Sequence, residues 1–452
     1  MTTAGRELPD DLIADVLRRL PPRSLAVSRC VCTAWRGLVD ARRLLRVDLL
    51  PRSVGGIFLN YCVLYSPEFL SRPTAGPTIS GDLEFVPGFS KVVDHCNGLL
   101  LVEGTSRGHD YVCNPATRRW ARLPPCPVPR TGNFCYRIKC LAYDPTVSPH
   151  FEVFLIPSLP HPSSHPQPQS EWPPSSYELQ VFSSKTGCWE ERSFVLEGGH
   201  LEEWVFVPEG GRVVDKLYWR EELYVLCEIG SVLRISMSNA KYRMVPKPSD
   251  AECEHHGCLC LGRSEKGVYC AFNHDWHGLR IFLLNESAGG QLQWELKHIV
   301  DFRSFARKLL AREDYSQQHK GPWMLQDINY YKYPYGNSKH KEPVKDKFEW
   351  NSDDDDVLNT EDIVEGSYVG YAHFIGFHPY KEIAFLDMGL TRAVAYHWNT
   401  SKFQDLGSIY PKDYHEIAGH VAEIETSFIY TPCWMEDFPQ NNLEAQIEDQ
   451  HK

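Results

Sequence analysis

Apolar residues in the first fifty positions recur at helical spacing. The first run shares one wide helical face and comprises Leu12, Ile13, Val16, Leu17 and Leu20. Pro9 stands just before this run, where a helix needs no backbone N–H, and Asp10 can cap the first turn. Pro21 and Pro22 then end the helix. We therefore predict a short amphipathic helix that begins near Pro9.

Two further short helices are predicted after the first. Their apolar positions are Leu25, Val27 and Cys30 for the second helix and Trp35, Leu38 and Val39 for the third. Thr33 can cap the third helix. A helical unit of about 40 residues buries too little apolar surface to be stable alone. Its apolar face must pack on the rest of this chain or on a partner, and the periodicity leaves both possibilities open.

From about Val92 onward the pattern changes to short apolar runs of β type, separated by turn residues. One unit recurs: a strand, a turn rich in Asn, Ser, Thr or Gly, and an aromatic residue that opens the next strand. The aromatic residues are Trp120, Trp189, Tyr242, Trp294 and Phe403. The two middle intervals are close to 50 residues, and the last is about twice as long. The long interval predicts one degenerate unit between Trp294 and Phe403.

A period near 50 residues with several strands per unit is typical of a β-propeller. We predict about six to eight blades, with a pair of irregular β-sandwiches as the alternative. The chain is thus expected to be mainly β with a small all-α N-terminal unit. Flexible loops are predicted near 157–176, which is rich in Pro, Ser and His, and near 312–362, which ends in an acidic run.

Three motifs of the helical unit carry more information than its periodicity. They are Leu8-Pro9-Asp10-Asp11-Leu12-Ile13, Leu20-Pro21-Pro22-Arg23-Ser24-Leu25 and Arg29-Cys30-Val31-Cys32-Thr33-Ala34-Trp35. In order and spacing they resemble the LPxDLL opening, the LPxxSL middle and the RxVCxxW close of the F-box. The resemblance runs from Leu8 to Leu45. Thr33 departs from it, at a position where Lys or Arg is common.

This resemblance implies a substrate receptor of an SCF-type cullin–RING ubiquitin ligase, whose F-box binds a Skp-type adaptor that links it to the cullin. The adaptor-facing positions would then be Leu8, Pro9, Ile13, Val16, Leu17, Leu20, Pro21 and Leu25. Positions that lie more internally or at the interface edge would be Val31, Cys32 and Trp35. Such an apolar cluster suits burial in the groove of a helical partner.

The start of the β-rich body carries a second resemblance. Its two stretches are Asp94-His95-Cys96-Asn97-Gly98-Leu99-Leu100-Leu101 and Asn114-Pro115-Ala116-Thr117-Arg118-Arg119-Trp120-Ala121-Arg122-Leu123-Pro124. They resemble the CNGLLL and NPxTxxWxxLP signatures of plant F-box-associated domains, which directly follow an F-box. The resemblances imply an F-box at 1–50 and a propeller-like substrate-recognition domain at 51–435. The acidic tail at 436–452 is expected to be disordered.

Charge limits the classes of partner. The net charge of −12 disfavours generic nucleic-acid binding, although the first fifty residues hold nine Arg against six acidic side chains. We interpret this local excess as a solvated helix surface that complements an acidic partner, with DNA binding as the alternative. The sequence has no signal-peptide pattern at its start and no apolar run of membrane-spanning length. We therefore expect no membrane partner, and a cytoplasmic or nuclear location in which the 15 Cys are reduced.

Candidate chemistry is sparse. The best metal candidates are Cys253, His255, His256, Cys258 and Cys260. Zinc sites usually need Cys-x2-Cys on a turn, whereas Cys258 and Cys260 alternate as in a strand, so we interpret them as buried thiols preceded by surface histidines. We interpret His274-Asp275-Trp276-His277 as a hairpin loop and Asp353–Asp356 as a solvated acidic run. The sequence holds no HExxH, P-loop or helix-opening GxGxxG motif.

We therefore predict no catalytic, metal-binding or cofactor-binding residues, no cofactor, and a non-catalytic receptor that positions a protein target. Two other functions stay open. One is a non-ligase F-box scaffold whose propeller binds a peptide or a sugar. The other is a propeller hydrolase or lectin with a helical cap, although no acid pair recurs at a fixed place in each unit. The target cannot be read from the sequence, because propellers bind through loops.

Overall fold

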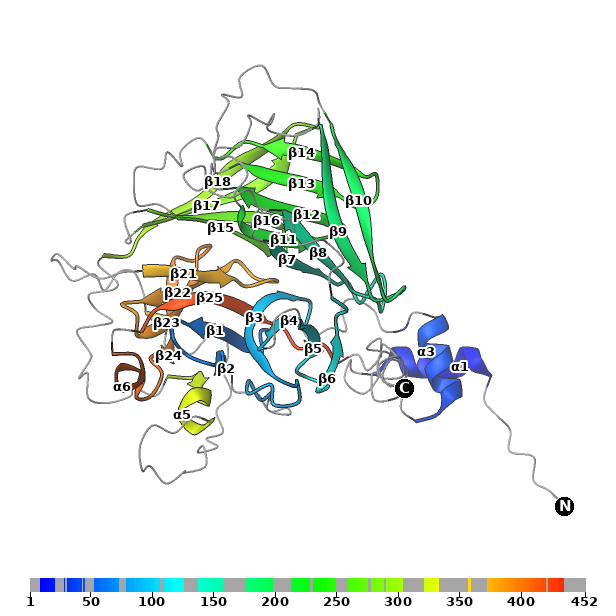
Figure 1. Ribbon diagram of the computed structural model, residues 1–452, viewed down its shortest axis with the longest axis horizontal. Helices are drawn as coiled ribbons and strands as arrows, with labels where there is room; N and C mark the ends of the chain where they lie inside the picture. Colours follow the sequence, from blue (N-terminus) through cyan, green and yellow to red (C-terminus); the bar gives the residue numbers. More distant parts are fainter. Residues whose placement is uncertain are drawn as a thin grey trace.

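The structure is a computed structural model that describes residues 9–20, 28, 31–42, 44, 53–72, 79–105, 109–125, 137–157, 175–197, 213–227, 231–248, 258–274, 278–287, 290–303, 321–332, 357–358, 372–419 and 422–434. It is mainly β, as predicted, with a small helical unit at its N-terminal end (Figure 1). The helices lie outside the β domain, beside one of its edges. The helical unit and the β domain are therefore two separate structural units.

The helical unit contains α1 (Asp10–Arg18) and α3 (Thr33–Ala41). Its small apolar core is formed by Ala14, Leu17, Leu38, Val39 and Leu44. Both helices have one apolar side, as the spacing predicted, and these sides face each other across the core.

The two predicted helix caps are wrong. Asp10 and Thr33 are already the first helical residues of α1 and α3, one position too late to act as N-caps. Pro9 precedes α1, and no side chain caps that helix. At α3 the Sγ atom of Cys32 accepts the amide hydrogen of Trp35 at 3.4 Å. Cys32 therefore takes the capping role expected of Thr33.

The described strands of the β domain form six blades. Blade I contains β1 (Gly56–Tyr61), β2 (Glu68–Ser71), β19 (Met324–Leu325) and β25 (Ile424–Tyr430). Blade II contains β3 (Phe89–Cys96), β4 (Leu99–Gly104), β5 (Asp110–Asn114) and β6 (Arg119–Arg122). Blade III contains β7 (Arg137–Ala142), β8 (Glu152–Pro157), β9 (Ser176–Ser183) and β10 (Cys188–Leu196).

The other three blades follow the same order. Blade IV contains β11 (Val213–Trp219), β12 (Glu222–Cys227), β13 (Val232–Ser236) and β14 (Lys241–Val245). Blade V contains β15 (Cys258–Ser264), β16 (Gly267–His274), β17 (Gly278–Glu286) and β18 (Leu292–Asp301). Blade VI contains β21 (Ala372–Phe377), β22 (Ile383–Met388), β23 (Arg392–His397), β24 (Lys402–Ser408) and the short β20 (Val357–Leu358). Two short helices are α5 (Ile328–Lys332) and α6 (Tyr414–Ala418).

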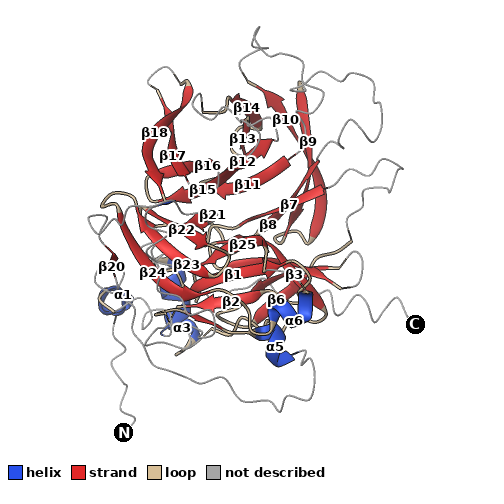
Figure 2. Cartoon of the chain, turned by 90° about the vertical axis from the view of Figure 1, so that its left-hand side faces the viewer, coloured by secondary structure: helices blue, strands red, loops and turns tan. Residues whose placement is uncertain are grey.

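One strand at the edge of each blade belongs to a closed ring. In order, the contacting strands are β3, β7, β11, β15, β21 and β25, and β25 returns to contact β3. These strands surround the centre of the domain, and the sheets fan outward from them (Figures 1 and 2). A ring of sheets is a β-propeller rather than a pair of sandwiches. Six blades lie at the lower end of the predicted range.

Blade I closes the ring by joining distant parts of the chain. β25 pairs antiparallel with β1, from Gly56 opposite Tyr430 to Tyr61 opposite Ile424. The buried side chain of Asn60 donates to Thr426 Oγ1, 366 residues away, and to the Val92 carbonyl of blade II, each at 2.7 Å. The closure therefore depends on hydrogen bonds between the two ends of the β domain.

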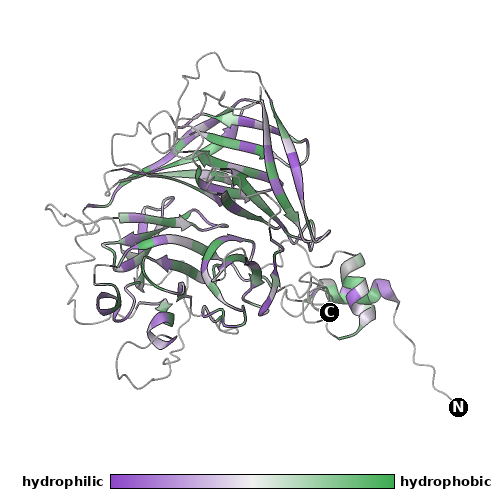
Figure 3. Ribbon diagram, in the orientation of Figure 1, coloured by the Kyte–Doolittle hydropathy of each residue, from purple (hydrophilic) through white to green (hydrophobic). Residues whose placement is uncertain are grey.

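Apolar packing between blades explains the short apolar runs of the sequence. Strands such as β1 and β22 are buried at every position, because both faces of a blade pack against its neighbours. Apolar residues dominate the strands near the centre, and polar residues are more frequent on the outer strand β10 (Figure 3). β10 also pairs in parallel with β14, so blades III and IV form one eight-stranded sheet.

In blades II to VI the recurring aromatic residue lies at or near the start of the fourth strand counted from the ring. Its positions are Trp120 in β6, Trp189 in β10, Tyr242 in β14, Trp294 in β18 and Phe403 in β24. The indole Nε1 of Trp189 donates to the Pro124 carbonyl, and that of Trp294 to the Pro246 carbonyl, each at 2.9 Å. The predicted repeat is therefore one blade, and in blades III and V its tryptophan fastens the blade to the one before it.

The prediction of a degenerate unit between Trp294 and Phe403 is wrong. β15 of blade V contacts β21 of blade VI directly, so no further blade stands between them. Within the described residues of this interval, β19 pairs with β2 of blade I and β20 pairs with β24 of blade VI. The additional chain therefore extends two existing blades.

The flexible loop predicted near 312–362 is wrong for residues 321–332. Trp323 is 2% exposed. The buried carboxylate of Glu68 accepts hydrogen bonds from the amides of Ile328 at 2.6 Å and Asn329 at 2.9 Å. Burial raises the pKa of Glu68 to about 7, although these bonds act in the opposite direction. The rest of that predicted loop, apart from 357–358, and residues 158–174 of the other predicted loop lie outside the described residues.

Asp387 is a buried carboxyl near the end of β22, and it makes stability depend on pH. It is 1% exposed, and no hydrogen bond reaches its Oδ1 within the described part of the chain. Burial raises its pKa from 3.8 to about 8. The folded state then binds a proton that the unfolded state has lost, so this group lowers stability as pH rises from about 4 to about 8.

We expect Asp387→Asn to remove this pH dependence. The variant should be more stable than the wild type by on the order of 2–5 kcal/mol at pH 8, and similar to it at pH 4.5. Urea unfolding at the two pH values measures the difference, with the pH 4.5 pair as the internal control. An equal loss of stability with pH in both proteins would contradict the assignment.

Candidate functional site

Helix α1 carries more apolar surface than the helical core buries. Ala14 and Leu17 face the core and are 2% and 1% exposed. Leu12 and Val16 are 52% and 60% exposed. These two residues are four positions apart, so their side chains are neighbours on the outer face of the helix. The helical unit thus presents an apolar strip that nothing in the described chain covers.

The predicted adaptor-binding residues fall into three environments. Exposed residues are Pro9, Val16, Val31 and Cys32. Half-buried residues beside the helical core are Ile13, Leu20 and Trp35. Leu17 is buried inside that core, which leaves it no surface for a partner. The remaining predicted residues, Leu8, Pro21 and Leu25, lie outside the described residues.

Val31 is 62% exposed, which excludes the internal position expected for it, and its place at the interface edge stays a prediction. Leu12 was missing from the predicted set, yet it takes the outward position that was assigned to Leu17. The apolar periodicity contained a signal for Leu12, since both leucines lie on the same wide face. Only the position of α3 decides which side of that face is buried.

The signature residues of blade II hold the chain that follows β25. Asn114 Nδ2 donates to the Cys433 carbonyl at 2.9 Å. Gly98 has φ +89°, and a Cβ atom there would lie 2.4 Å from Cβ of Cys433. Asn97 Nδ2 donates to the Tyr143 carbonyl beside blade III at 2.6 Å. These motifs therefore fasten blade II to its neighbours and to the closing segment, which is a structural role.

Charged side chains cross the centre of the ring in bonded pairs. Lys216 Nζ of blade IV lies 3.5 Å from Asp94 Oδ1 of blade II. Arg263 of blade V donates to Asn97 of blade II across the ring. Burial lowers the pKa of the neighbouring His95 to about 4, so this imidazole is neutral. We interpret this central cluster as a support of the ring.

The other candidate sites are divided between described and undescribed residues. Cys258 and Cys260 lie in β15, which confirms the strand predicted from their alternation. The β16–β17 pairing confirms the predicted hairpin around His274. Residues outside the described part are Cys253, His255, His256, 275–277 and Asp353–Asp356. Among the described residues, no three His, Cys, Asp or Glu side chains are grouped to hold a metal ion. None of the described helices has the length and apolar character needed to cross a bilayer.

Two family models match the chain in the order in which the structure places its parts. Residues 6–47 match the F-box domain, and residues 85–309 match the family described as F-box protein At3g26010-like, beta-propeller. The F-box/kelch-repeat protein At1g15680 of Arabidopsis thaliana is 21% identical over 66% of this chain and 73% of its own length. The F-box protein At3g16210 of the same plant is 26% identical over 53% of this chain and 61% of its own length.

A solved structure, the Cps50 (Swd1) β-propeller domain of Myceliophteria thermophila, covers 70% of this chain and 71% of its own, with 9% identity and a TM-score of 0.32. That score is too low to add to the assignment, which rests on the family models and the closed ring. An F-box domain implies a Skp-type adaptor as its partner. This chain is a plant F-box protein, in which an F-box domain precedes a β-propeller whose described strands form six blades.

Proposed function

We propose that this chain is the substrate-recognition subunit of an SCF-type cullin–RING ubiquitin ligase. The exposed strip of Leu12 and Val16 on α1 carries the proposal. It lies on a helical unit outside the propeller, so an adaptor can cover it without disturbing the blades. The adaptor then connects the chain to the cullin.

The propeller supplies the second half of this function by holding a target protein. Its ring is rigid, because each blade is buried between two neighbours and β25 closes the circle. A target bound to such a ring is kept near the ubiquitin-carrying subunits, and proximity of this kind accelerates transfer. In this proposal the chain is non-catalytic and binds no cofactor. It acts in the cytoplasm or the nucleus, where its thiols stay reduced.

The test compares the full-length chain with the double variant Leu12→Asp/Val16→Asp in plant cells. We expect the Skp-type adaptor and a cullin to co-purify with the wild type only. Proteins retained by both forms are the target candidates, and their levels should rise when the wild type is replaced by the variant. If the adaptor binds but no retained protein changes in level, the chain is a non-ligase scaffold. If neither adaptor nor cullin co-purifies, the proposal fails at its first step.

A further inference from the structure

A pocket of about 310 Å³ opens between blades IV and V, beside the turn that joins β11 to β12. Its apolar surface comes from Val268, Leu284 and Leu292 of blade V and from Trp219 of blade IV. All four belong to the apolar core between these blades, so this core reaches the surface here. The volume is at the lower end of the range of about 300–1,000 Å³ that is usual for ligand sites. It suits one or two side chains of a bound peptide.

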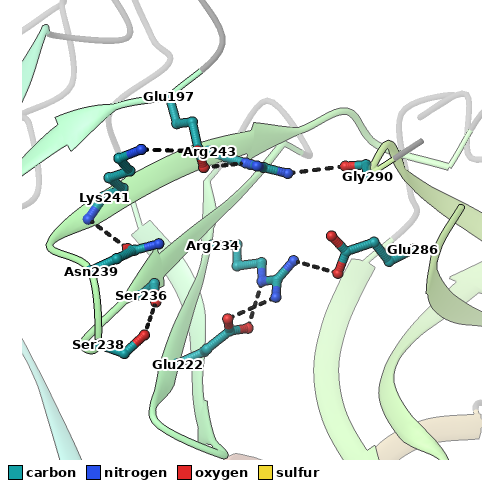
Figure 4. A network of polar contacts seen from close by, with 10 residues as sticks. All are labelled: Glu197, Glu222, Arg234, Ser236, Ser238, Asn239, Lys241, Arg243, Glu286 and Gly290. Atoms are coloured by element: carbon teal, nitrogen blue, oxygen red, sulfur yellow. Dashed lines mark hydrogen bonds and ion pairs between the residues drawn. The ribbon is translucent and has the colours of Figure 1, made fainter. Parts of the chain in front are cut away.

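The charges inside the pocket largely neutralise one another. Arg234 holds Glu222 with two hydrogen bonds, of 2.5 and 2.7 Å, and reaches Glu286 across the blade boundary at 3.2 Å (Figure 4). Two parallel bonds fix the pair formed by Arg234 and Glu222. Both lining carboxylates therefore already have a cationic partner.

Arg220 contributes the remaining charge among the lining residues. It stands in the turn after β11 at φ +50°, and its guanidinium carbon lies 4.3 Å from the centroid of the Trp219 ring. No acidic side chain of the described chain pairs with it. The tryptophan ring orients the guanidinium while leaving its N–H groups available, and a planar guanidinium prefers carboxylate or phosphate.

We propose that this pocket binds a short segment of a target protein in which an apolar side chain stands next to an anionic one. The apolar side chain packs on Val268, Leu284 and Leu292. The anionic group, a carboxylate or a phosphate, pairs with Arg220. This site deepens the proposed function, because it names the class of segment that the propeller would select. The overall charge of −12 opposes acidic ligands at long range, so recognition depends on the local pair.

The test measures peptide binding to the full-length chain in complex with its adaptor, by fluorescence anisotropy. The probes are Gly/Ser-flanked peptides with the central sequence Glu-Leu-Phe, with phosphoserine in place of Glu, with Lys in place of Glu, and with Ser in place of Leu and Phe. We expect Kd values of about 10–100 µM for the better of the two anionic peptides. The Lys and Ser peptides should bind at least about 10-fold more weakly. A preference between Glu and phosphoserine identifies the anion, and either preference supports the site.

Two pairs of variants separate this pocket from general surface charge. Arg220→Glu should weaken binding of the anionic peptide at least about 10-fold. Its matched control is Arg118→Glu, since Arg118 is also an exposed turn residue at positive φ, with its guanidinium 5.3 Å from the Phe85 ring centroid. Leu292→Ser should also weaken binding. Leu296→Ser, on the same strand but outside the pocket, should leave it unchanged.

The proposal is overturned if no anionic peptide binds, if the Lys peptide binds equally well, or if the Arg118 and Arg220 variants lose affinity equally. Adaptor binding is measured in the same samples by co-elution. If the anionic peptides do not bind while the adaptor still binds, the pocket assignment is wrong and the proposed function is unaffected. If the adaptor fails to bind, the proposed function is contradicted independently of the pocket.

Discussion

The double variant Leu12→Asp/Val16→Asp is expected to bind the Skp-type adaptor at least about 100-fold more weakly than the wild type. Both side chains are more than half exposed and adjacent on α1, so a partner that covers this face must bury them. Burying a Leu or Val side chain contributes about 1.5–3 kcal/mol. The substitutions remove that contribution and place two carboxylates where they would be desolvated without partners.

The variant should stay folded, because neither residue belongs to the core between α1 and α3. Titration calorimetry with the purified adaptor measures the affinity, and circular dichroism checks the fold. Val147→Asp is a matched control, since Val147 is 63% exposed but lies in the propeller. If the variant binds the adaptor within about threefold of the wild-type affinity, α1 is not part of the adaptor interface.

Gly98→Ala is expected to lower the free energy of unfolding by about 3 kcal/mol or more. The backbone at Gly98 has φ +89°, which costs energy for any residue with a Cβ atom. The added Cβ would also meet the backbone nitrogen of Cys433 at 2.6 Å and the carbonyl oxygen of Thr431 at 2.7 Å. The segment after β25 must then move, and the bond from Asn114 to the Cys433 carbonyl is lost with it.

Gly187→Ala separates the strain of positive φ from the steric clash of the added Cβ atom. Gly187 also has positive φ, at +72°, but a Cβ atom there would meet nothing within 4 Å. We expect it to cost only about 1 kcal/mol, from the backbone strain alone. Urea unfolding of both variants measures the difference, which reports the close approach of the closing segment to blade II. Equal losses in the two variants would show that this approach contributes nothing to stability.

The predictable part of the fold came from local patterns. The helical spacing of Leu12 to Leu20 predicted α1, and the alternation around Cys258 and Cys260 predicted β15. Trp189 and Trp294 marked the starts of outer strands, where the indole of each donates a hydrogen bond to the preceding blade. The F-box and propeller assignments followed from motifs of this local kind.

The cap assigned to Thr33 is a local error, because α3 begins at Thr33 itself and Cys32 takes the capping role. Two other errors come from contact between distant parts of the chain. Residues 321–332 were predicted to be part of a loop, because the sequence around them does not indicate that the distant Glu68 binds the start of α5. Leu12 and Leu17 are equivalent in periodicity, and α3 alone decides which of them faces out.

By itself, the sequence determined the helical N-terminal unit, the repeated β architecture and the F-box identity, because each is written in residues close together along the chain. Only the tertiary structure decided that there are six blades, that β25 closes the ring on β1, and that the strip of Leu12 and Val16 is exposed. It also created the pocket beside Arg220, whose walls come from two blades. These features depend on hydrogen bonds and packing between segments far apart in sequence. The spacing of residues along the chain does not predict such contacts.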